Sequence, residues 1–218
     1  MPKKRQEISL EDLDIGPYEI DKASIRVQNN VSTAKFSRFI NLSGVSMKNP
    51  EFVIQTPNHF SAAVFRIVDS GYHYGKYTKC TKRVASNVFR SGKIVTTGAK
   101  LSSAAILQLS MALSRLKKNY DENISVSDFL LRNVVVTMKI PGKTVNLDRL
   151  YKDHPDFCCY SKKIFPGLIM ILPNGHRPKA NIFTSASIVM PGSYDLEYSE
   201  KCLTWVYNVI YDYLEDAE

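Results

Sequence analysis

Apolar and polar positions along the chain predict the same order of elements twice. Alternating residues 25–35 and 129–140 predict a long opening strand in each half, and short helical turns are expected at 42–48 and 147–152. Further β-rich segments of the first half are predicted at residues 51–55, 62–68, 85–89 and 93–97. Apolar residues at helical spacing predict a closing helix at 102–119, with a serine cap, and another at 197–214.

Short sequence strings also recur between the two halves, which indicates an internal duplication. The string at 28–31 returns at 132–135, and Phe89 with its neighbours returns as Phe183, 94 positions later. Phe60 returns as Phe165 after 105 positions, so the first copy carries about ten extra residues, which we assign to an exposed loop at about 69–82. We expect an α+β fold in which two pseudo-symmetric repeats join into one curved antiparallel sheet, with helices on one face.

The charge is distributed unevenly over these parts. The chain of 218 residues has a net charge of +8. An acidic tail at 1–21 carries −3, the first repeat at 22–119 carries +14, and the second repeat at 120–218 carries +1 up to residue 211 and then −4. An excess of fourteen positive charges in one repeat indicates a polyanionic partner, with nucleic acid as the first candidate.

Other functional classes are disfavoured by what the sequence lacks. No apolar run reaches the length of a membrane span or a secretory signal. His154, Cys158 and Cys159 form a cluster that suggests zinc, but no second pair of ligands stands nearby in sequence, so we expect free thiols and no metal or cofactor. The sequence has no cluster of carboxylates and no histidine within a catalytic motif, so nothing in it indicates an enzyme.

The face of the sheet not covered by helices carries the candidate site. Side chains alternate along a strand, so Asn29, Val31 and Thr33 share a face, as do Lys93, Val95 and Thr97. Small apolar groups between amides and hydroxyls suit the minor groove, although half-buried strand residues of this kind are also common. Four phenylalanines at polar turns, paired by the duplication, are typical of wedges inserted between base steps, and they are Phe60, Phe89, Phe165 and Phe183.

Three strings of the chain resemble the TATA-box-binding protein family, namely Gln-Asn-Asn-Val-Ser-Thr at 28–33, Phe-Arg-Ser-Gly-Lys-Ile-Val-Thr-Thr-Gly-Ala-Lys at 89–100 and Phe-Pro-Gly-Leu-Ile at 165–169. The resemblance covers residues 25–214 and implies a saddle that grips A/T-rich duplex DNA by its minor groove, inserts the four phenylalanines and bends the duplex. It implies base contacts by Asn29, Asn133 and Thr97, groove packing by Val31, Val95, Val135 and Val189, and phosphate contacts by Arg66, Ser91, Lys93 and Lys100.

The second repeat departs from this family pattern. Ser187 and Tyr194 replace lysines, Pro191 replaces a threonine, and Ile171 stands where an arginine is expected. We therefore predict one-sided DNA binding, in which the first repeat anchors the duplex and the second mainly inserts its wedges.

A second departure lies at Ser161, Lys162 and Lys163, where the family carries glutamates that dock transcription factor IIB. The reversed charge predicts a co-adapted factor IIB-like partner within the RNA polymerase machinery, although a solvated turn is an equal interpretation. Such divergence is typical of versions carried by large DNA viruses or protists, so we expect the protein in the nucleus, or in a viral factory or virion.

Two functions remain open at this point. The leading one is a promoter-recognition factor that binds and bends A/T-rich DNA without catalysis. The alternative is a degenerate scaffold of the same fold that binds other transcription proteins. The intact phenylalanines and asparagines favour the first, and the altered second repeat favours the alternative.

Overall fold

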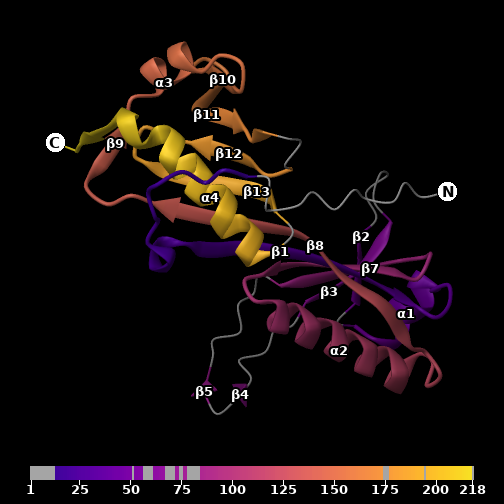
Figure 1. Ribbon diagram of the computed structural model, residues 1–218. Coiled ribbons are helices and arrows are strands. Elements are labelled where there is room, and N and C mark those ends of the chain that lie inside the picture. Colours follow the sequence, from indigo (N-terminus) through magenta and orange to yellow (C-terminus); the bar gives the residue numbers. More distant parts are fainter. Residues whose placement is uncertain are drawn as a thin grey trace. The chain divides into compact units, whose positions relative to one another are not determined.

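The computed structural model describes residues 13–217 apart from gaps at 51, 56–60, 67–71, 74–75, 78–83, 174–176 and 194 (Figure 1). Phe60, Tyr194 and much of the predicted 69–82 loop therefore lie outside the described residues. The chain divides into two compact units, one of Gln28–Arg132 and one of Met1–Val27 with Asn133–Glu218. Each unit is described by itself.

The first unit is an antiparallel sheet backed by helices. Its strands lie in the order β1 (Arg26–Phe36), β7 (Lys93–Ala99), β6 (Ala85–Phe89), β3 (Ala62–Arg66) and β2 (Phe52–Gln55). Helices α1 (Leu42–Lys48) and α2 (Ser102–Asn119) pack against these strands. Within the predicted loop, β4 (Tyr72–His73) pairs with β5 (Lys76–Tyr77).

The second unit repeats this order. Its strands are β8 (Val126–Lys139), β13 (Ser187–Ser193), β12 (Lys179–Ile182), β11 (Phe165–Ile171) and β10 (Cys158–Ser161). Helix α3 (Leu147–Asp153) packs beside β10, and α4 (Leu196–Ile210) packs on β13 and crosses the strands of this sheet (Figure 1). In the described part of the chain, no helix is long and apolar enough to cross a membrane.

The two units differ in what they bury between sheet and helix. In the first unit the helix-facing positions of β1, β6 and β7 include Asn30, Ser32, Ser86 and Thr96, and all four are at most 4% exposed. The four matching positions of the second unit are apolar, namely Val134, Val136, Ala180 and Met190, and the buried hydroxyl of β13 is that of Ser193, which bonds Ser199 of α4 at 2.7 Å. The Ser86 and Thr96 hydroxyls bond each other at 2.8 Å, so the first core is held partly by polar contacts.

Two sequence expectations about the helices are wrong. The closing helix of the second repeat ends at Ile210, not at residue 214, because the chain turns through a 3-10 helix at Tyr211–Tyr213 into β14 (Leu214–Asp216). Strand β14 pairs with β9 (Lys143–Val145), so strand pairing and not the intrinsic preference of Leu-Glu-Asp decides the conformation of this end. Helix α2 has no serine cap, since the residue before its first turn is Leu101, whose side chain makes no capping hydrogen bond.

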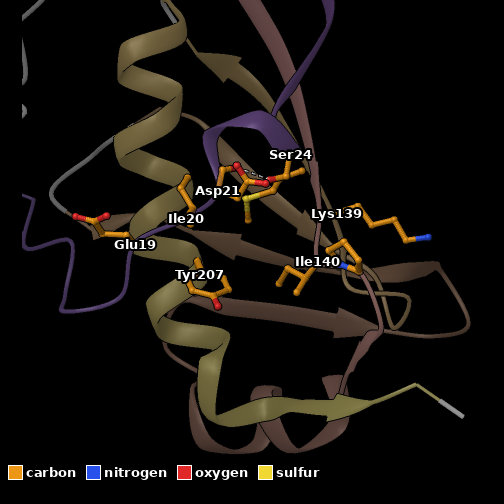
Figure 2. A pocket seen from close by; sticks show the side chains of 9 residues that line it. Glu19, Ile20, Asp21, Ser24, Lys139, Ile140 and Tyr207 are labelled. Carbon is orange, nitrogen blue, oxygen red and sulfur yellow. Dashed lines mark hydrogen bonds between the residues drawn. The ribbon is translucent and has the colours of Figure 1, made fainter.

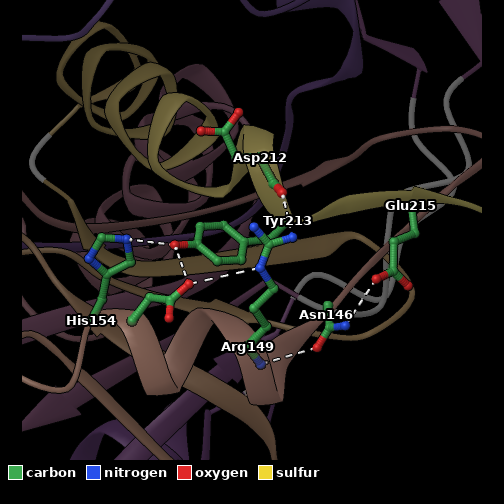
Figure 3. A network of polar contacts seen from close by, with 7 residues as sticks. Asn146, Arg149, His154, Asp212, Tyr213 and Glu215 are labelled. Atoms are coloured by element: carbon green, nitrogen blue, oxygen red, sulfur yellow. Dashed lines mark hydrogen bonds and ion pairs between the residues drawn. The ribbon is translucent and has the colours of Figure 1, made fainter.

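A polar network holds the C-terminal turn against α3 (Figure 3). The Tyr213 hydroxyl lies 3.2 Å from the Asp153 carboxylate and 3.1 Å from His154 Nε2. Burial, followed by the hydrogen bond to Asp153, raises the pKa of Tyr213. His154 is therefore engaged with Tyr213, while Cys158 and Cys159 point to opposite faces of β10, one buried and one exposed. Among the described residues no three potential metal ligands gather in one place.

The end of the predicted acidic tail packs on the second unit. Tyr18 stacks on Tyr211 with ring centroids 3.8 Å apart, and the Asn208 amide bonds both the N–H and the carbonyl of Tyr18 at 2.8 Å. A small pocket lies where this segment meets Tyr207 of α4 and the end of β8 (Figure 2). Residues 13–24 thus form part of this unit's helix-covered side.

Candidate functional site

Each sheet has one face that its helices leave uncovered, and the strand register defines the residues on it. In the first unit a cross-strand row runs through Val64, Asn87, Val95 and Thr33. In the second unit the same row runs through Ile169, Asn181, Val189 and Thr137. We call these two surfaces the open faces. The register matches position by position, so the duplication seen in the sequence extends to the face geometry.

Asn29 and Asn133 stand on the open faces in the same way. Asn29 Oδ1 accepts a hydrogen bond from the Gly98 N–H at 2.7 Å, and Asn133 Oδ1 accepts one from the Gly192 N–H at 2.8 Å. Because a backbone N–H is always a donor, this contact fixes which amide atom is the oxygen. In each half-buried asparagine the oxygen is engaged by this contact, and the NH₂ group, which can only donate, has no partner among the described residues.

A β-bulge in each sheet places the glycine N–H within hydrogen-bond distance of the asparagine oxygen. The register of β1 with β7 shifts between Asn30 and Ser32, and that of β13 with β8 shifts between Met190 and Ser193. Gly98 and Gly192 lie within these bulges at φ values of 90° and 95°, a backbone conformation that favours glycine. Pro191 lies in the second bulge, where its missing N–H is tolerated.

Phe165 and Phe183 lie together at one end of the second open face. Their rings meet edge to face with centroids 5.7 Å apart, and both are only partly buried. A Cβ placed on Gly167 would lie 2.8 Å from the Phe165 ring and 3.0 Å from the Phe183 ring, so only glycine leaves room beneath the pair. Phe89 is likewise half-buried at the end of β6, opposite Ala62.

The other predicted contact residues also lie on or beside the open faces. The four valines are partly buried, as is Thr97. Arg66, Ser91, Lys93 and Lys100 are exposed, and the Ser91 hydroxyl accepts a hydrogen bond from the Lys93 N–H at 3.4 Å. The predicted residues of each described repeat are thus brought to one surface, with Phe60 outside the described residues.

A cation of the second open face was missed by sequence reasoning. Ile171 is directly opposite Lys179, just as Arg66 is directly opposite Ala85 in the first unit. Each unit therefore has one exposed cation in this cross-strand pair. In the first unit it is Arg66 on β3, and in the second it is Lys179 on β12, the strand next to the one that carries Ile171. A comparison of the two repeats position by position shows only that the arginine is replaced by Ile171. It does not show Lys179, because only strand pairing places Lys179 beside Ile171. Asn87 and Asn181 were missed for the same reason.

The predicted docking turn is less basic than its sequence indicates. Lys162 Nζ lies 2.6 Å from the Asp148 carboxylate, and this hydrogen bond, followed by the charge attraction, raises the pKa of Lys162. Ser161 and Lys163 are exposed, and beside them Ile164 is 87% exposed. Within the described part of the chain, the turn therefore offers one unpaired lysine, Lys163, next to an apolar side chain.

Fold and open faces together define a class of protein built from two homologous sheet-and-helix repeats with matched uncovered faces. The sequence profile described as "Transcription factor TFIID (or TATA-binding protein, TBP)" matches residues 24–119 and 128–213. The chain belongs to this family. The predicted α+β fold class of two pseudo-symmetric repeats is confirmed by these matches.

Comparisons with individual proteins also give similarity to this family. The chain is 29% identical to the TATA-box-binding protein of Tetrahymena thermophila over 86% of this chain and 70% of that protein. It is 27% identical to the TATA-box-binding protein-like 1 of Entamoeba histolytica over 92% of this chain and 85% of that protein. The solved Methanococcus jannaschii TBP superposes with a TM-score of 0.69 at 26% identity, covering 87% of this chain and 99% of that one.

Proposed function

We propose that this chain is a promoter-recognition factor whose open faces bind the minor groove of A/T-rich duplex DNA. The observation that carries the proposal is the matched pair of fixed asparagines. Asn29 and Asn133 each have their oxygen held by a glycine N–H, which fixes the amide and leaves its NH₂ donors without a partner among the described residues. The floor of the minor groove at A·T pairs offers only acceptors, so two fixed donors suit it and would meet the amino group of guanine unfavourably.

The phenylalanines support DNA bending as part of this function. Phe165 and Phe183 form a two-ring wedge above Gly167, and partly exposed aromatic wedges of this kind enter between base steps and unstack them. Phe60 and Phe89 would form the second wedge.

The charge of the chain supports the same proposal. Exposed Lys35, Arg66 and Lys93 stand on the first open face, and Lys139 and Lys179 on the second. Each cation placed at a phosphate releases counterions and adds to a salt-dependent affinity. The first repeat remains the more basic, so we retain it as the main anchor, but the second contributes cations as well as wedges.

Fluorescence anisotropy with an A·T-rich and a G·C-rich duplex at two salt concentrations tests the proposal. We expect tighter binding to the A·T-rich duplex, a loss of that preference in Asn29→Ala and Asn133→Ala, and weaker binding in Phe60→Ala and Phe165→Ala. Equal and weak affinity of the unaltered chain for both duplexes would overturn the proposal.

That outcome would favour a scaffold that binds other transcription proteins instead. The exposed Ile164 beside Lys163 is the observation that favours this second function. A factor IIB-like protein is the proposed partner of residues 161–163, within the RNA polymerase machinery and in the nucleus. We propose no catalytic role, and we keep the division into tail 1–21 and repeats 22–119 and 120–218 as a prediction.

A further inference from the structure

Two further asparagines occupy the middle of the open faces. Asn87 lies opposite Val95, and Asn181 lies opposite Val189, so the two amides hold the same place in the two repeats. Their strand neighbours Ser86, Val88, Ala180 and Ile182 are fully buried beneath the sheets, which directs both amides to the uncovered side. Both asparagines are partly buried among apolar neighbours.

These amides differ from Asn29 and Asn133 in one respect. Within the described part of the chain, neither the Asn87 nor the Asn181 side chain takes part in a hydrogen bond. An unheld amide rotates to present either its oxygen as an acceptor or its NH₂ group as a donor. An amide between such apolar side chains that finds no partner on binding would lose its water without replacement, at a cost to affinity.

We infer that Asn87 and Asn181 determine sequence specificity by accepting a hydrogen bond from the guanine amino group, so that a G·C pair is tolerated at two symmetric positions of the site. Only the guanine amino group distinguishes G·C from A·T pairs on the groove floor, and only an acceptor can pair with it. The Asn29 and Asn133 oxygens already accept a glycine N–H, whereas the Asn87 and Asn181 oxygens accept no hydrogen bond from the described residues. The inference rests on the proposed DNA binding.

The test uses an A·T-rich duplex in which one pair at a time is replaced by G·C, and a parallel series in which it is replaced by inosine·C. Inosine lacks the amino group, so its pair presents an A·T-like minor groove. A G·C pair is expected to weaken binding about fivefold or more at most positions. At two positions related by the duplex symmetry, we expect a change below about twofold.

Asn87→Val and Asn181→Val identify the amides responsible. Each substitution is expected to make G·C about two- to tenfold worse relative to inosine·C at one tolerant position, the range of one hydrogen bond. Asn123→Val, on an exposed turn whose side chain serves no described contact, is the matched control. Thermal unfolding of all three variants checks that they fold.

Two results would overturn the inference and are distinguishable. If the unaltered chain prefers A·T-rich DNA but has no tolerant positions, or if the valine variants keep its profile, the specificity role is wrong while DNA binding stands. If the unaltered chain shows no A·T preference and Asn29→Ala changes nothing, the proposed function fails and this inference fails with it.

Discussion

Lys179→Ala is expected to lower the salt dependence of duplex binding by one phosphate contact. Lys179 is exposed on β12 and lies directly opposite Ile171, the position where the first unit carries Arg66. Residues opposite each other on antiparallel strands have Cβ atoms roughly 5 Å apart, so a lysine side chain reaches the region that an arginine on the neighbouring strand would occupy. The second repeat thereby has a cation beside the position where its sequence lacks the arginine, and we expect this cation to contact a phosphate.

The size of the effect follows from counterion release. One phosphate contact contributes roughly 0.9 to the slope of log affinity against log salt. Between 50 and 200 mM salt, the affinity of the Lys179→Ala chain should therefore fall about 3.5-fold less than that of the unaltered chain. Arg66→Ala should change the slope by the same amount, because it removes the corresponding cation of the first repeat.

Anisotropy titrations at four salt concentrations measure these slopes. The matched variant is the exchange Ile171→Arg with Lys179→Ala, which recreates the arrangement of Arg66 and Ala85 and should restore the slope. Lys152→Ala, at an exposed position of helix α3 whose ammonium makes no ion pair with the described residues, controls for net charge alone. If Lys179→Ala leaves the slope unchanged while Arg66→Ala lowers it, the second repeat holds no phosphate here and the one-sided prediction stands in full.

Two further predictions concern stability. Gly92→Ala should lower the free energy of unfolding by about 2 kcal/mol in urea titrations, since φ is +82° and the new Cβ would lie 2.5 Å from the Arg38 carbonyl oxygen. Gly142→Ala, with φ +67° and open space, should lose less, and equal losses would mean that the close contact contributes nothing. Burial raises the pKa of Cys158 and Cys202 to about 12, so the unfolded thiols ionise first and stability should fall as pH rises above 9. Replacing both cysteines by alanine should flatten that fall between pH 8 and 10.5, and an unchanged fall would contradict the assignment to these thiols.

Much of the architecture was predictable because it is encoded locally. The bounds of α1, α2 and β6 agree with the predicted 42–48, 102–119 and 85–89, since apolar spacing along one segment decides both its period and its buried side. The expected end of α4 failed because residues 211–216 have mixed preferences, and pairing with β9 decided their conformation. A serine cap was expected for α2 because a serine stands at the start of the helical pattern, but Leu101 holds the capping position.

The features of the candidate site also fall into those that the local sequence encodes and those that depend on the folded structure. The sequence by itself determined which residues recur between the repeats, and therefore that Asn29 matches Asn133 and that Phe89 matches Phe183. It could not show that the Asn29 oxygen is held by Gly98, that Lys179 faces Ile171, or that Lys162 is paired with Asp148. Those contacts join residues 69, 8 and 14 positions apart. Strand register, bulges and turn geometry bring such residues together, and these are properties of the folded sheet that no single segment specifies.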